Sequence, residues 1–165
     1  MRHLIVVRHA KAEPYAEADH ARALTASGVR AAGDVGQWLV AQGLRPDYAL
    51  VSSATRTRQT WAAIENQLGA SIHVEFADDL YHAGPDDVID AVRWVPVDAQ
   101  TVIYVGHNPT AGELAHLLDD GTGDQALLAQ IALGYPTAAA TVFDVAGDWR
   151  DLRMGGATLR SGNQG

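Results

Sequence analysis

The chain has 165 residues, a length that favours one domain with a single core. Its composition, 47% hydrophobic and 19% charged, is typical of a soluble globular protein, and its formal net charge of −8 argues against a general affinity for nucleic acid or for an anionic membrane. The sequence contains no cysteine, which excludes a disulfide framework, a thiolate nucleophile and cysteine-ligated zinc.

The sequence shows no sign of a targeting or membrane segment. The N-terminal apolar run, Leu4–Val7, is interrupted by Arg8 and is too short for a signal peptide. No other stretch approaches the roughly 18 apolar residues that read as a membrane-spanning helix. We therefore expect a cytoplasmic protein.

Hydrophobic periodicity, capping residues and turn residues divide the chain into alternating strands and helices. Ser53 and Asn108 are typical N-cap residues and are expected to begin the second and fourth helices. In chain order, the predicted elements are a strand at 3–8, a polar loop at 10–24, a helix at 25–41, a strand at 48–51, a helix at 53–68, a strand at 72–76, a helix at 85–94, a strand at 101–105 and a helix at 109–118.

The last part of the chain completes the predicted fold. Residues 139–145 and 149–153 read as a hairpin. Strands that alternate with helices imply an α/β fold, a three-layer α/β/α sandwich with a largely parallel central sheet and a late antiparallel edge hairpin. The predicted organisation is one catalytic domain over residues 1–154 and a glycine-rich, flexible tail over residues 155–165.

Two of the predicted strands are followed by a histidine. His9 follows the first strand and stands beside Arg8, and His107 follows the fourth strand. In an open α/β sheet, ligands bind outside the carboxyl ends of the strands, so the two imidazoles are expected to lie together. Arg56 falls in the first turn of the second helix, where the helix dipole disfavours a cation by roughly 0.3–1 kcal/mol and an anion would offset that cost. These residues outline a site that could hold and attack a phosphoryl group.

The sequence around these residues resembles a known family. Residues 8–10, Arg-His-Ala, resemble the active-site signature of the histidine phosphatase (phosphoglycerate mutase-like) superfamily. Residues 52–60 look like the family's second-arginine motif, with Arg56 in the arginine position, and residues 105–109 look like its second-histidine motif.

Two further segments, residues 19–25 and residues 135–138, resemble the short SixA-like phosphohistidine phosphatase branch of this superfamily. Ala10 and Ser53 depart from the family pattern, in which glycine and proline are usual. Neither departure removes a side chain that the chemistry needs.

Phosphoryl transfer requires a nucleophile and groups that neutralise charge on three equatorial oxygens. His9 is the expected nucleophile, because a neutral imidazole nitrogen can attack phosphorus and can later leave. Arg8 and Arg56 are expected to donate hydrogen bonds to the nonbridging oxygens, and His107 adds a charged donor if it is protonated. Asn108 and the helix terminus after it could add backbone N–H groups.

The remaining polar residues give weaker signals. Arg22 is expected either to touch phosphate or substrate or to form a surface ion pair, and Arg58 is expected to face solvent. The other histidines have no spacing that suggests a shared metal, so no metal and no cofactor are expected. Asp79 lies nearest in position to the carboxylic acid that many superfamily members use and is the candidate proton donor, with Glu13 as another loop candidate.

The expected function is a metal-independent phosphatase that acts through a phosphohistidine intermediate, with protein phosphohistidine as the preferred substrate. The lack of a convincing acid favours a phosphoramidate over a phosphoester, because the departing nitrogen can take its proton from solvent or from the second histidine. The short connection between the third and fourth strands leaves no room for a lid, and an open site suits a phosphate carried on a protein surface.

Two alternatives remain open. One is a small-molecule phosphomonoester or nucleotide phosphatase, and the other is a non-catalytic phosphate-binding module on the same fold. The expected partner is a phosphorylated protein or a small phosphorylated substrate, and the chain is expected to act as a monomer without nucleic acid or membrane.

Overall fold

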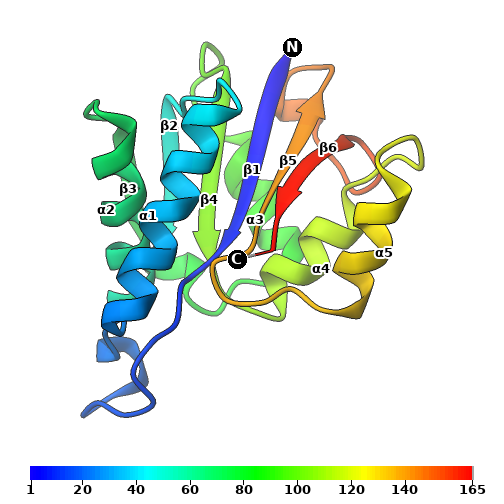
Figure 1. Cartoon of the computed structure of the whole chain (residues 1–165). Coiled ribbons are helices and arrows are strands. Elements are labelled where there is room, and N and C mark those ends of the chain that lie inside the picture. The colour runs from blue at the N-terminus through cyan, green and yellow to red at the C-terminus, as the bar shows by residue number, and fades with distance from the viewer. Residues whose placement is uncertain (165) are drawn as a thin grey trace.

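The computed structural model describes residues 1–164 and shows a six-stranded sheet with helices on both faces (Figure 1). The strands lie side by side in the order β3-β2-β4-β1-β5-β6. The first four strands pair in parallel, whereas β5 is antiparallel to both β1 and β6. The strand bounds are β1 (Arg2–Arg8), β2 (Tyr48–Ser52), β3 (His73–Ala77), β4 (Thr101–Gly106), β5 (Ala140–Val145) and β6 (Thr158–Asn163).

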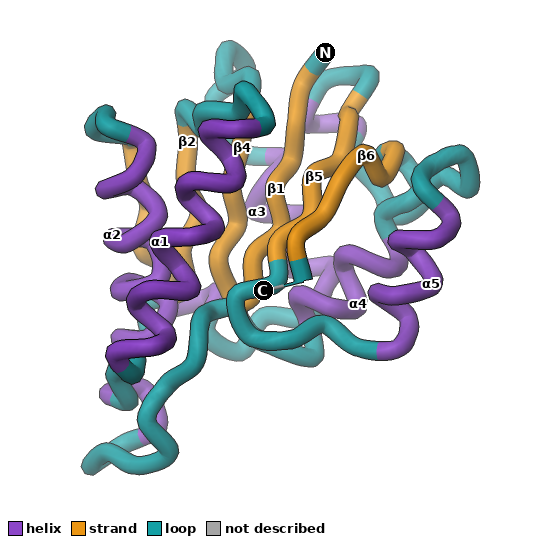
Figure 2. The backbone as a smooth tube through the Cα atoms, viewed as in Figure 1, coloured by secondary structure: helices purple, strands orange, loops and turns teal. Residues whose placement is uncertain are grey.

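Two helices cover one face of the sheet and three cover the other (Figure 2). The core beneath α1 and α2 is separate from the core beneath α3, α4 and α5. The arrangement is the predicted three-layer α/β/α sandwich. The helix bounds are α1 (Ala26–Ala41), α2 (Thr55–Leu68), α3 (Pro85–Arg93), α4 (Thr110–Leu117) and α5 (Gln125–Leu133), with short 3₁₀ turns η1 (Asp19–Ala21), η2 (Asp78–Leu80) and η3 (Trp149–Asp151).

The alternation of side chains along β1 explains why its sequence is a continuous apolar run. Leu4 and Val6 enter the core beneath α3, α4 and α5, while Ile5 and Val7 enter the core beneath α1 and α2. All four side chains are fully buried. A strand whose two faces are both covered needs apolar residues at every position, which is typical of parallel sheets.

The carboxyl ends of β1, β2 and β4 meet at one edge of the sheet. Arg8 pairs with Gly106, and Val51 pairs with Val105, so the three strands end at the same level. A Cβ atom at Gly106 would collide with the hydroxyl of Tyr104, so only glycine fits at the last position of β4. The residues that follow these strands therefore share one small region.

The prediction was wrong about the second strand of the hairpin, which lies in the segment that was expected to be a flexible tail. The partner of β5 is β6 at Thr158–Asn163, in place of residues 149–153. Trp149 is buried in a 3₁₀ turn and donates to the Ala99 carbonyl, which removes it from the sheet. The glycine-rich segment has little strand propensity of its own, but Leu159 is buried against the sheet and its N–H donates to Asp119. Gly165, the last residue of the expected tail, lies outside the described residues.

Two predicted helix caps are displaced by one residue. The N-cap of α2 is Ala54 rather than Ser53, and the N-cap of α4 is Pro109 rather than Asn108. The Ser53 hydroxyl instead hydrogen-bonds the Nε2 of His20. A tertiary contact thus takes the Ser53 side chain that local propensity would use as a cap, whereas the Asn108 side-chain oxygen still accepts from the Gly112 N–H in the first turn of α4. Within residues 1–164, no helix is both long and apolar enough to cross a membrane.

Candidate active site

The structure brings His9 and His107 together at the shared edge of the sheet. The N–H of His9 donates to the Gly106 carbonyl at 2.9 Å, which carries the β1–β4 pairing one residue beyond β1. The centroids of the His9 and His107 rings are 5.5 Å apart. The expected proximity of the two imidazoles is confirmed.

His9 is held in one tautomer by its own backbone. Its Nδ1–H donates to the carbonyl of Ala10 at 2.7 Å, so the proton of the neutral ring lies on Nδ1 and Nε2 keeps a free lone pair. Burial lowers the pKa of His9 to about 4, and the positive charges of Arg56 and Arg8 act in the same direction. The ring is therefore neutral and nucleophilic at neutral pH.

His107 is also neutral, which differs from the protonated donor that the sequence allowed. Burial lowers its pKa to about 3, and the positive charge of Arg56 adds to the effect. Its Nε2 lies 2.7 Å from the hydroxyl of Ser52, the last residue of β2. Its Nδ1 is buried and has no hydrogen-bond partner among the described residues.

Arg8 and Arg56 lie close enough to His9 for their charges to lower its pKa, and each has an N–H group without a hydrogen-bond partner among the described residues. Arg56 is only 5% exposed, and its terminal nitrogens donate to the backbone carbonyl and the carboxylate of Asp19 at 2.8 and 3.0 Å. Arg8 donates to the carbonyl of Tyr135 at 3.0 Å. The Nε atoms of both arginines are buried without a partner within residues 1–164. Buried donors without acceptors are costly, so these groups favour an anionic ligand rich in oxygen.

Asp19 is a central residue that the sequence reasoning did not place in the site. Its carboxylate accepts hydrogen bonds from Arg22 at 2.9 Å, from Arg56, and from the hydroxyl of Tyr81. These three donors, Tyr81 foremost, hold the pKa of Asp19 well below its usual range. The carboxylate therefore stays ionised and fixes Arg22 and Arg56 at the edge of the site.

Tyr81 forms an aromatic border next to the two histidines. Its ring centroid lies 5.5 Å from that of His107, 4.8 Å from that of His20 and 4.3 Å from that of His82. The guanidinium of Arg56 lies 5.9 Å from the Tyr81 ring centre. No local pattern in the sequence singled out Tyr81, because all of these neighbours except His82 come from other segments of the chain.

Three of the residues weighed from the sequence are held by protein groups. Arg22 forms an ion pair with Asp19, one of the two roles expected for it, and also donates to the carbonyl of Glu13. The Asn108 amide donates to the Tyr135 carbonyl and accepts from the Gly112 N–H, so its side chain is engaged at both ends. Arg58 is exposed as expected, and its guanidinium lies 4.2 Å from the centre of the Phe76 ring.

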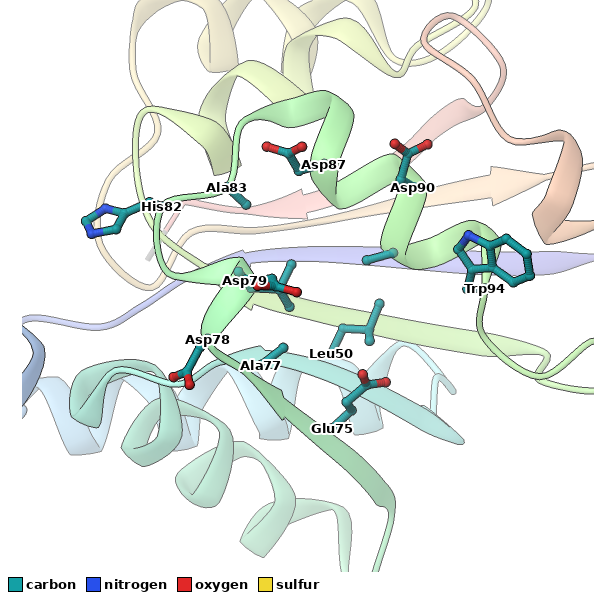
Figure 3. A pocket seen from close by; sticks show the side chains of 12 residues that line it. Leu50, Glu75, Ala77, Asp78, Asp79, His82, Ala83, Asp87, Asp90 and Trp94 are labelled. Carbon is teal, nitrogen blue, oxygen red and sulfur yellow. The ribbon is translucent and has the colours of Figure 1, made fainter.

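Asp79, the candidate proton donor, lies in a neighbouring pocket of about 620 Å³ (Figure 3). The labelled side chains around it include Glu75, Asp78, Asp87 and Asp90, which make that pocket acidic. Within residues 1–164, no hydrogen bond or ion pair joins Asp79 to either histidine or either arginine.

His107 lines a different pocket, of about 360 Å³. Tyr81, His82 and Glu113 also line it, so this pocket contains a carboxylate that the sequence did not suggest. Throughout residues 1–164, no three histidine, aspartate or glutamate side chains cluster in a way that could hold a metal ion.

The depressed pKa values predict how stability depends on pH. An unfolded histidine has a pKa of about 6.5, so the unfolded chain binds more protons than the fold between about pH 4 and pH 6.5. The free energy of unfolding should therefore fall as the pH drops through this window, and His9 alone should contribute a loss of roughly 1–2 kcal/mol between pH 7 and pH 5.

Urea unfolding of the wild type and of His9→Asn at several pH values measures this contribution. The variant should lose less stability on acidification, whereas His116→Asn, a change at an exposed position on α4, should behave like the wild type. Equal slopes for the wild type and His9→Asn would show that His9 is not buried as a neutral ring.

Sequence comparison places the chain among known proteins. The profile of the Histidine phosphatase superfamily (branch 1) matches residues 4–81. An uncharacterized protein of Mycobacterium tuberculosis is 40% identical over 155 residues, which cover 93% of this chain and 96% of that protein. The similarity therefore extends over both histidine-bearing segments.

Solved structures agree with this assignment. A candidate phosphohistidine phosphatase SixA from Nakamurella multipartitia is 37% identical, with a TM-score of 0.83 and coverage of 98% of this chain and 95% of that one. A candidate phosphohistidine phosphatase SixA from Agrobacterium tumefaciens is 30% identical, with a TM-score of 0.76 and coverage of 87% and 92%. The chain therefore belongs to the histidine phosphatase superfamily, in its SixA-like branch, and is a phosphatase.

Proposed function

We propose that this phosphatase acts without a metal ion, through a phosphoryl group carried on His9, and that its substrate is phosphohistidine on a protein. The observation that carries the proposal is the pair of neutral imidazoles with ring centroids 5.5 Å apart, beside buried guanidinium donors that lack acceptors. The names of the SixA relatives support the choice of substrate.

The reaction has two displacements at phosphorus. In the first, the lone pair of His9 Nε2 forms a bond to phosphorus, and the bond to the leaving group breaks with its electron pair going to the leaving group, which takes up a proton. In the second, water attacks phosphorus and loses a proton, and the N–P bond breaks with its electron pair returning to Nε2. Arg8 and Arg56 stabilise the charge on the nonbridging oxygens in both transition states.

The short connection between β3 and α3 favours a phosphoryl group that is carried on the surface of another protein. Residues 78–84 are all that join β3 to α3 beside the site, so this connection has no room for a covering insertion. An open site admits a phosphorylated side chain on a protein surface, while a mutase must keep its intermediate away from water. This geometry is the reason for preferring a protein substrate.

A panel of phosphorylated substrates tests the proposal. A phosphohistidine-bearing protein, a small phosphoramidate, an aryl phosphate, an alkyl phosphate and a nucleotide are assayed side by side, each with and without a chelator. We expect the phosphohistidine protein to give the highest kcat/KM and the chelator to change no rate. Activity that disappears with chelator and returns with added metal would contradict the metal-independent mechanism.

The leaving group provides a second, independent prediction. Asp79→Asn and Glu113→Gln should leave turnover of phosphoramidates within about twofold of the wild type, because the departing nitrogen can take its proton from solvent. If either carboxyl group is a general acid, its loss should slow esters with poor leaving groups by roughly 10²–10⁴-fold. The measurement is kcat/KM for both variants across leaving groups of rising pKa.

Efficient hydrolysis of an alkyl phosphate that is lost selectively in one of these variants would overturn the preference for phosphohistidine. The chain would then be a small-molecule phosphatase, with the affected carboxylate as its proton donor.

A further inference from the structure

His107 is held by Ser52, a residue to which the proposed reaction gives no direct role. Ser52, at the end of β2, is fully buried, and its hydroxyl lies 2.7 Å from the Nε2 of His107. The hydroxyl of Thr57 donates to the Ser52 carbonyl, also at 2.7 Å, and Thr57 is fully buried as well. The backbone that carries the Ser52 hydroxyl is therefore held by both β2 and α2.

An anionic ligand decides how this bond is oriented. If Nε2 carries the ring proton and donates to Ser52, then the serine proton has no acceptor and the Nδ1 lone pair of His107 would face the ligand oxygen, because the structure gives neither group a second contact. If Ser52 donates to Nε2, the Nδ1–H can donate to that oxygen and no donor is left unpaired. Each unpaired buried polar group costs about 1–3 kcal/mol, so a bound phosphate favours the second arrangement.

We infer that Ser52 is a positioning residue that fixes His107 in the Nδ1–H tautomer, so that this N–H donates to an oxygen of the phosphoryl group. Nε2 is occupied by Ser52, so Nδ1 is the only ring nitrogen of His107 that can contact a ligand. This role rests on the proposed function, since it concerns the same phosphoryl site.

The two histidines then share the Nδ1–H tautomer but present different ring nitrogens to the phosphoryl group, Nε2 of His9 and Nδ1 of His107. The backbone bond to Ala10 leaves His9 with a lone pair on Nε2, while Ser52 leaves His107 with a proton on Nδ1. One ring can attack phosphorus and the other can donate to a nonbridging oxygen. A lone pair on Nδ1 of His107 would repel that oxygen, so the wrong tautomer would weaken phosphate binding.

Nuclear magnetic resonance of the ¹⁵N-histidine-labelled full chain tests this inference without relying on turnover. Long-range ¹H–¹⁵N correlations distinguish the two neutral tautomers, and inorganic phosphate serves as the ligand. In the wild type at pH 7 we expect His107 to carry its proton on Nδ1 and that signal to shift when phosphate binds. A His107 ring with its proton on Nε2 in the wild type would overturn the inference, with no variant needed.

Three variants separate positioning from structure. Ser52→Ala should move His107 toward the Nε2–H tautomer and raise the phosphate Kd about 10-fold, the loss of one hydrogen bond to a charged group. Ser52→Thr keeps the hydroxyl and should restore the Nδ1–H tautomer. Ser53→Ala is the matched control, because the neighbouring hydroxyl contacts His20 and its loss should leave the His107 signals unchanged.

An unchanged tautomer in Ser52→Ala, in a variant whose circular dichroism matches the wild type, would overturn the role of Ser52. A phosphate-induced shift at Nδ1 together with no hydrolysis of any phosphorylated substrate would instead count against the proposed function while supporting the assigned tautomer. The two hypotheses therefore fail in different ways.

Discussion

Replacement of His9 with alanine is expected to lower kcat by about 10⁴-fold or more, because the variant has no atom that can carry the phosphoryl group. The fold should survive, since the imidazole follows the end of β1 and its one hydrogen bond is to the adjacent Ala10 carbonyl. Steady-state kinetics on the best substrate measure the first effect, and thermal unfolding measures the second.

A matched control exists within the chain. His116 is exposed on α4, so His116→Ala should keep wild-type kinetics. Substantial activity in a folded His9→Ala enzyme would contradict the assignment of the nucleophile. It would also favour direct attack of water on phosphorus.

Replacement of Arg56 with alanine is expected to lower kcat/KM by about 10³-fold, the loss typical of a preorganised cationic donor to a transferring phosphoryl group. Arg56 is 5% exposed, so solvent screens its charge only weakly from a bound anion. Arg56→Lys should recover only part of this loss, because an ammonium group cannot reproduce the planar fork of donors. Inorganic phosphate should bind more weakly to both variants.

The comparison with Arg58 isolates the effect of position. Arg58 lies on the same helix but is exposed and stacks on Phe76, so Arg58→Ala should change kcat/KM by no more than about twofold. Equal losses in the Arg56 and Arg58 variants would mean that helix α2 contributes a general positive field instead of a specific contact.

Much of the site could be predicted from the sequence, because it depends on local patterns. The apolar runs before His9 and His107 indicate buried parallel strands, and the ends of such strands converge by topology. Arg56 was noticeable for a related reason, since a cation in the first turn of a helix is unfavourable unless an anion lies nearby. Both signals come from a few adjacent residues.

The rest of the site depends on contacts between distant segments. Asp19 meets Arg56 through a polar loop whose path no periodicity defines, and Ser52 meets His107 across two neighbouring strands. The edge strand β6 was missed for the same reason, because this segment, which follows two glycines, is extended by pairing with β5 instead of by its own propensity. Tertiary hydrogen bonds of this kind leave no signature in a single sequence.

The most direct test of the central claim is to trap the phosphoryl group on the enzyme. The wild type is mixed with a labelled phosphoramidate, quenched in base within one turnover, digested and mapped by mass spectrometry. The account predicts a phosphoryl group on the peptide that contains His9, stable in base, lost in acid and absent from His9→Ala. Full turnover with no adduct at any time, or with the phosphoryl group on a different residue, would contradict it.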